Sequence, residues 1–164
     1  MIAAGGICDG CGMAAAFALG AEGIQMGTRF VSCTESPVHA NYKNAIIDAS
    51  ETGTLVLNKK STPCIRALKS QRTRAIHDQG LMAPEALKGI REVYFHGEME
   101  AAPALAGQSA GLIDAVKSAQ QITRGSRGAV LCHHRQARRA GNGEGIWVSC
   151  TDAACLIAPA GSAS

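Results

Sequence analysis

The first thirty residues constrain the fold more than any other part of the chain. Two short apolar blocks, at residues 2–4 and 23–26, flank a helix of small residues at 12–19. Asp9 stands where its side chain can cap the start of that helix. A short helical connection makes the two strands parallel, with a right-handed crossover. The sequence therefore predicts a βαβ unit.

Small residues follow both expected strands. Gly5-Gly6 ends the first and Gly27-Thr28 ends the second. Several backbone N–H groups should therefore gather at one end of the sheet, where the helix N-terminus near residues 10–12 adds partial positive charge and favours a phosphate group. Glycines also permit tight strand-to-helix turns without any ligand. The residues alone leave both interpretations open.

The composition is that of a globular protein, with 46% hydrophobic residues and a mean hydropathy of +0.04. Its 164 residues suffice for one domain or for part of a larger one. A net charge of +3 with mixed signs does not indicate binding to nucleic acid or to a membrane. The start lacks the pattern of a signal peptide, and seven unevenly spaced cysteines suggest free thiols. We therefore expect a cytoplasmic protein.

The middle of the chain predicts mainly helices. One is expected to run to about residue 49, with Ser36 as N-cap and Pro37 as first helical residue. Others are expected at 65–77, from 83 up to Gly97, and at 103–122 with interruptions near Gly107 and Gly111. A short extended segment is expected at 54–57 and an exposed turn at Lys59-Lys60.

After residue 122 the pattern changes. Residues 123–164 contain no lysine, three of the seven cysteines and the single tryptophan. No helical or strand period persists there, so we expect this tail to be disordered or foreign to the preceding fold. The predicted division is 1–32, 33–122 and 123–164.

Two cysteine motifs are weak signals for a site. Cys8 and Cys11 form a C-x-x-C pair at a helix start, where thiol pKa values tend to fall, but no second pair stands at zinc spacing. Cys132-His133-His134 has no supporting pattern either. We assign no metal site.

Specific strings of residues carry a family resemblance. Ala3-Ala4-Gly5-Gly6-Ile7-x-Asp9-Gly10-x-Gly12 and the segment from Ala18-Leu19-Gly20 to Gln25-Met26-Gly27-Thr28-Arg29-Phe30 closely resemble the nitronate monooxygenase (2-nitropropane dioxygenase) family. They are also similar to flavin-dependent enoyl-acyl-carrier-protein reductases. The resemblance continues through residues 35–43, 66–69, 96–98 and 106–113 and covers about residues 1–122.

The resemblance implies an α/β fold: the C-terminal fragment of an FMN-binding (β/α)₈ TIM barrel, holding its last two parallel strands and the C-terminal helices. Gly5, Gly6, Gly27 and Thr28 match positions that hold the FMN phosphate in that family. Met26 would lie beside them, and Gln108 belongs to a segment that returns toward the flavin.

The implied activity is oxidation of a nitronate with dioxygen. An alternative is reduction of an enoyl thioester, which would also need a nicotinamide donor. The family's assisting histidine lies on a strand that this chain lacks, so we assign no catalytic residue. A third possibility is a truncated remnant without catalysis, or a half that works with a partner chain or a second copy, because two parallel strands cannot close a barrel.

Overall fold

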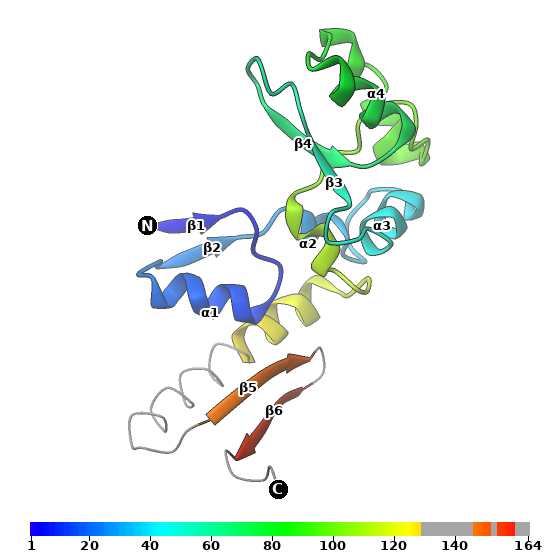
Figure 1. Cartoon of the computed structure of the whole chain (residues 1–164). Coiled ribbons are helices and arrows are strands. Elements are labelled where there is room, and N and C mark those ends of the chain that lie inside the picture. Colours follow the sequence, from blue (N-terminus) through cyan, green and yellow to red (C-terminus); the bar gives the residue numbers. More distant parts are fainter. Residues whose placement is uncertain (129–145, 152–153, 160–164) are drawn as a thin grey trace, which may run out of the picture. The chain divides into compact units, whose positions relative to one another are not determined.

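The computed structural model describes residues 1–128, 146–151 and 154–159, and the chain divides into two compact units (Figure 1). The first unit comprises Met1–Ala3, Asp9–Ile24 and the residues from Gln120 onward. The second comprises Ala4–Cys8 and Gln25–Ala119. Within the described part of the chain, no helix has the length and apolar character needed to cross a membrane.

The beginning of the chain folds as its sequence predicts. Strand β1 (Ile2–Ala4) and strand β2 (Gly23–Gln25) form a two-stranded sheet, with helix α1 (Gly10–Ala18) as the connection. Figure 1 shows both strands running in the same direction. The Asp9 side chain accepts a hydrogen bond of 2.8 Å from the Gly12 N–H and caps α1. The predicted βαβ layout and its cap are confirmed.

A hairpin lies in the segment for which the sequence predicted no regular element. Strands β5 (Ile146–Thr151) and β6 (Ala154–Pro159) pair antiparallel, from Ile146 opposite Pro159 to Thr151 opposite Ala154. Residues 119–128 are helical.

In the second unit, helix α2 (Thr28–Val31) follows β2 directly, and helix α3 (Ala40–Ile47) comes next. The predicted helix start at Ser36 is wrong. The His39 side chain accepts a hydrogen bond of 3.1 Å from the Asn41 N–H, so His39 is the N-cap and the helix begins after it. The main core of this unit contains Tyr42, Ile46, Leu68, Val93, Ala110 and Ile113.

Strand β3 (Thr54–Leu57) confirms the extended segment expected there, but the helix predicted at 65–77 is wrong in its first part. Residues of strand β4 (Ile65–Leu68) pair antiparallel with β3. Helix α4 (Gln71–Gln79) starts only after Ser70, whose side chain forms a capping box with Thr73. The hairpin and α4 share a second, smaller core of Leu57, Ala67, Ile76 and Ala86.

The helix predicted from 83 to Gly97 is broken into two short pieces. They are the 3₁₀ turn η1 (Pro84–Leu87) and the single π turn η2 (Glu92–His96). A side-chain carbon on Gly89, between them, would stand 2.6 Å from the Ala101 carbonyl oxygen, so the chain is closely packed at that point.

The helix predicted at 103–122 is wrong for most of its length, since only residues 119–122 of it are α-helical. Residues around Leu105 are extended beside β4, where the Leu68 N–H donates to the Ala104 carbonyl at 2.8 Å and the Ala106 N–H donates to the Arg66 carbonyl at 3.2 Å. A 3₁₀ turn, η3 (Gln108–Leu112), follows. Long-range pairing with β4 replaces the local helical hydrogen bonds in this segment.

Candidate functional site

All six residues predicted to bind the cofactor lie in the second unit. Gly5 and Gly6 form the turn after β1 and have φ angles of +87° and +74°, a left-handed conformation that glycine adopts without strain. A side-chain carbon on Gly6 would stand 3.8 Å from Gln108 Nε2. The structure thus brings the first glycine turn and Gln108 together.

Gly27 and Thr28 form the second predicted loop, at the start of α2. Gly27 is the N-cap, and a side-chain carbon there would meet no atom within 4 Å. The Thr28 hydroxyl oxygen accepts a hydrogen bond of 2.9 Å from the N–H of Gly107, the residue before Gln108. Both predicted loops therefore contact the segment around Gln108. Met26 is half-buried next to Gly27.

A hollow of about 330 Å³ lies beside the first glycine turn. It is lined by Gly6, Glu51, Gln108, Ser109, Gly111 and Leu112. Ser109 is 5% exposed, and its hydroxyl forms no hydrogen bond with any residue in the described ranges. A buried hydroxyl without a partner is unfavourable, so Ser109 has hydrogen-bonding capacity that a bound ligand could use.

Two buried groups hold the loops of the site in place. The Tyr42 hydroxyl donates a short hydrogen bond to the Leu105 carbonyl, two residues before Gly107, and burial raises the pKa of Tyr42 far above its usual value. The Tyr42 ring meets Tyr94 edge to face, with centroids 5.0 Å apart. Arg29, the second residue of α2, is buried and donates to the Ala115 carbonyl at 2.9 Å.

The sequence analysis missed Ser109 and Glu51. Ser109 belongs to the block 106–113 from which only Gln108 was selected, so a signal for it was present. Glu51 reaches the hollow because Gly111 packs against the backbone of residues 50 and 51. A side-chain carbon on Gly111 would stand 2.5 Å from the Ser50 carbonyl oxygen. No local pattern in the sequence encodes that contact.

The described part of the chain includes one of the two cysteine motifs, that of Cys8 and Cys11. Within it, no cluster of three or more His, Cys, Asp or Glu side chains could hold a metal ion. Cys33 and Cys64 carry free thiols. Cys11 is disulfide-bonded, so the predicted free thiol is wrong there, and Cys8 is not its partner. Cys132-His133-His134 lies outside the described residues.

The family model described as nitronate monooxygenase matches residues 1–125. A probable nitronate monooxygenase of Staphylococcus saprophyticus is 52% identical over 58 residues, which cover 35% of this chain and 16% of that protein. The nitronate monooxygenase of Paraburkholderia phytofirmans is 55% identical over 47 residues, covering 29% of this chain and 13% of that protein.

Solved structures are also similar to the chain, FabK and a nitroalkane oxidase among them. FabK from Thermotoga maritima is 42% identical, with a TM-score of 0.79 over 85% of this chain and 46% of that one. Nitroalkane oxidase from Streptomyces ansochromogenes has a TM-score of 0.66 at 24% identity, over 85% of this chain and 40% of that one, which shows a shared fold. The chain thus spans less than half the length of the relatives it matches.

Proposed function

Because the chain belongs to the nitronate monooxygenase family, we propose that it supplies the phosphate-binding part of an FMN-dependent oxidoreductase that oxidises nitronates with dioxygen. Backbone N–H groups of Gly5, Gly6, Gly27 and Thr28 would hold the FMN phosphate. Met26 would lie beside it, and Gln108 would contribute its amide. The observation that carries the proposal is that both glycine loops contact the segment around Gln108, which is remote from them in the sequence.

The second unit fits a phosphate group in two respects. Space is open around Gly5 and Gly27, where a side-chain carbon would meet no atom within 4 Å, so a ligand can approach the backbone closely. The Ser109 hydroxyl lines the hollow without a partner among the described residues and could donate to a phosphate oxygen. The Glu51 carboxylate accepts hydrogen bonds only, which suits hydroxyl groups of the FMN ribityl chain rather than its phosphate.

FMN would supply the redox chemistry when bound, and the protein binds and orients it. We accordingly assign a catalytic role to none of the residues of the site. We propose that the chain holds the last two strands of a (β/α)₈ barrel in residues 1–32, the helical region in 33–122 and an added tail in 123–164. It would then be weakly active or inactive alone, and would need a complementing chain or a second copy. Coverage of 46% of the FabK chain supports the proposal that this chain corresponds to part of a barrel.

A second candidate function is reduction of an enoyl thioester. It is favoured by the similarity to FabK, an enoyl-acyl-carrier-protein reductase, at 42% identity over 85% of this chain. In the complete, FMN-loaded enzyme, oxygen uptake with a nitronate would support the first function. Oxidation of NADH with an enoyl thioester would support the second.

The test is a titration of the chain with FMN, followed by quenching of flavin fluorescence. The informative variant is Gly27→Ala, because the added methyl group meets no protein atom within 4 Å and should obstruct only a ligand. Gly125→Ala is the matched control, since Gly125 also has open space and lies in the helical segment 119–128. We expect Gly27→Ala to weaken FMN binding roughly tenfold, about 1.4 kcal/mol, and Gly125→Ala to leave it unchanged.

Riboflavin, which lacks the phosphate, separates this site from general flavin binding. We expect riboflavin to bind much more weakly than FMN and to be indifferent to Gly27→Ala. Equal affinities for FMN and riboflavin, or equal effects of the two alanine variants, would refute the phosphate site.

A further inference from the structure

Positive charge is concentrated in one part of the second unit. Residues 59–91 contain eight lysines and arginines against two acids, a net charge of +6, whereas the whole chain has +3. The eight are Lys59, Lys60, Arg66, Lys69, Arg72, Arg74, Lys88 and Arg91. The rest of the chain is therefore net negative.

Ion pairs within the fold do not neutralise this charge. Arg66 is half-buried and donates to the Thr54 hydroxyl at 3.0 Å, while the other seven are exposed. None of the ion pairs among described residues involves any of the eight. Two carboxylates lie close by: Asp78 pairs with His77 at 3.3 Å, and Glu100 accepts hydrogen bonds from the Gln71 and Arg72 N–H groups. Like charges held together this way repel one another and destabilise the compact state. A binding partner of opposite charge would offset that repulsion.

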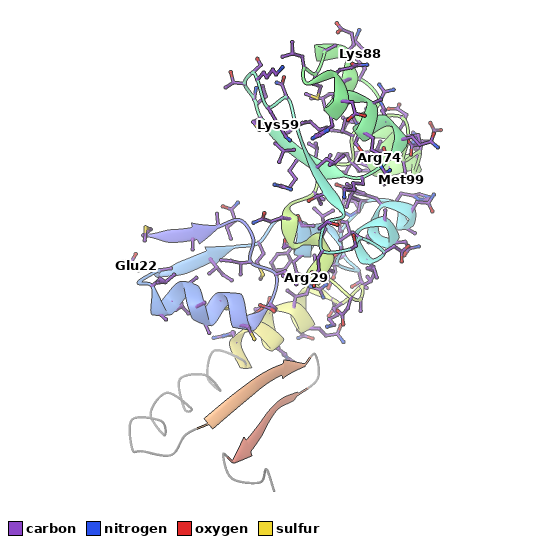
Figure 2. All side chains as sticks on the ribbon, viewed as in Figure 1. Glu22, Arg29, Lys59, Arg74, Lys88 and Met99 are labelled. Atoms are coloured by element: carbon purple, nitrogen blue, oxygen red, sulfur yellow. The ribbon has the colours of Figure 1, made fainter. Side chains whose placement is uncertain are left out.

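Some of these groups form one continuous surface. Lys59 Nζ lies 3.0 Å from His77 Nε2, which joins the tip of the β3–β4 hairpin to α4. Arg74 precedes His77 by three residues and so lies on the same side of α4. Lys60 Nζ would stand 3.8 Å from a side-chain carbon on Gly80, at the end of α4. We call Lys59, Lys60, Arg74 and His77 the basic face; Figure 2 shows Lys59 on the hairpin and Arg74 on α4.

Helix capping accounts for part of the basic face. Lys59 and Lys60 lie near the C-terminal end of α4, where cations interact favourably with the helix dipole. Arg74 lies in the middle of α4 (Gln71–Gln79), and Arg72 lies in its first turn, where a positive charge is unfavourable. Helix capping therefore does not explain the positive charges of Arg72 and Arg74.

We propose that the basic face is a docking surface for an acidic protein. Its charges lie on a hairpin and a helix, and none of its residues lines the hollow, so the arrangement suits an extended surface rather than one compact phosphate. Residues 59–91 contain no Phe, Tyr or Trp on which nucleic-acid bases could stack. Complementary charge steers such an encounter and fixes its orientation. The inference is independent of the flavin site.

The test measures binding of a fluorescent peptide rich in glutamate to the full chain, by anisotropy, at low and physiological salt. The double variant Lys60→Glu/Arg74→Glu is compared with Arg124→Glu/Arg127→Glu, which changes the net charge equally at exposed positions of the helical segment 119–128. We expect the first pair to weaken binding roughly tenfold or more, and the second to weaken it less than about twofold.

The milder pair Lys60→Gln/Arg74→Gln repeats the comparison if the glutamate variant fails to fold, as judged by circular dichroism. Equal weakening by the two glutamate pairs would mean that net charge alone drives binding, and would overturn the proposal. Tighter binding of tripolyphosphate or of a DNA duplex than of the acidic peptide would overturn it as well.

Discussion

The contact between Tyr42 and the Leu105 carbonyl offers the sharpest test of how the site loops are held. Replacing Tyr42 by phenylalanine removes the hydroxyl that donates to this carbonyl. The ring, which is fully buried and meets Tyr94 edge to face, stays in place. The perturbation is therefore confined to one hydrogen bond and one ionisable group.

At neutral pH the variant leaves the Leu105 carbonyl without its donor, which should lower the free energy of unfolding by about 1–3 kcal/mol. At alkaline pH this difference between the wild type and Tyr42→Phe becomes smaller. Burial, with a smaller contribution from Tyr94, raises the pKa of Tyr42 in the folded state. The stability linked to the neutral hydroxyl is thus fully present below about pH 10 and is lost as the pH rises further, by about 1.4 kcal/mol per pH unit. The curves of wild type and Tyr42→Phe should therefore converge above about pH 10.

Urea unfolding, followed by circular dichroism between about pH 7 and 11, measures this difference while the titration of lysines cancels between the two proteins. Tyr94→Phe is the control: it removes the other tyrosine hydroxyl of the pair and should keep most of the alkaline decline. Parallel curves for wild type and Tyr42→Phe across this range would refute a buried, neutral Tyr42 hydroxyl.

Two further predictions concern packing and acid stability. Gly111→Ala should lower the free energy of unfolding by about 1–3 kcal/mol, because its methyl group would stand 2.5 Å from the Ser50 carbonyl oxygen. Gly125→Ala, in open space on a helix, should raise it by about 0.5–1 kcal/mol; chemical denaturation compares the two, and equal effects would contradict the packing argument. The Ala119 N–H donates to Glu35 at 2.9 Å and, as the largest cause, lowers the pKa of that carboxyl. The stability that the ionised Glu35 carboxylate contributes is fully present above the usual glutamate pKa and is lost as the pH falls through the lowered pKa. Glu35→Gln should therefore reduce the loss of folding stability at acid pH. Urea unfolding measures this, and an equally steep loss of stability with falling pH in Glu35→Gln and in the wild type would contradict the stabilising role of Glu35.

The elements that the sequence predicted correctly are those fixed by neighbours in the chain. The first strand, the helix capped by Asp9 and the second strand depend on a side chain three residues from its partner and on glycines at the turns. The predicted helices at 65–77 and 103–122 failed in their first parts for the opposite reason. Ile65–Leu68 pairs with β3, and the chain around Leu105 pairs with β4, so partners remote in sequence overrode the local pattern.

The same distinction applies to the candidate site. The two glycine loops could be recognised because their residue types are visible in the sequence, and Gln108 because it belongs to a recognisable block. The contacts that join them could not, since Thr28 and Gly107 are 79 positions apart and Glu51 reaches the hollow through the backbone contact at Gly111. A sequence shows which loops could bind a phosphate, while long-range packing decides which loops meet.

The placement of these contacts also separates the proposed recognition of the FMN phosphate from the proposed oxidation reaction. Gly6, Thr28 and Gln108 belong to one compact unit, together with Tyr42 and Arg29, whose hydrogen bonds hold the neighbouring segments. The proposed phosphate site is therefore built from contacts internal to that unit. If recognition of the phosphate depends on these contacts, the preference for FMN over riboflavin should persist in this chain by itself, whereas oxidation of a nitronate should require the other strands of the proposed barrel.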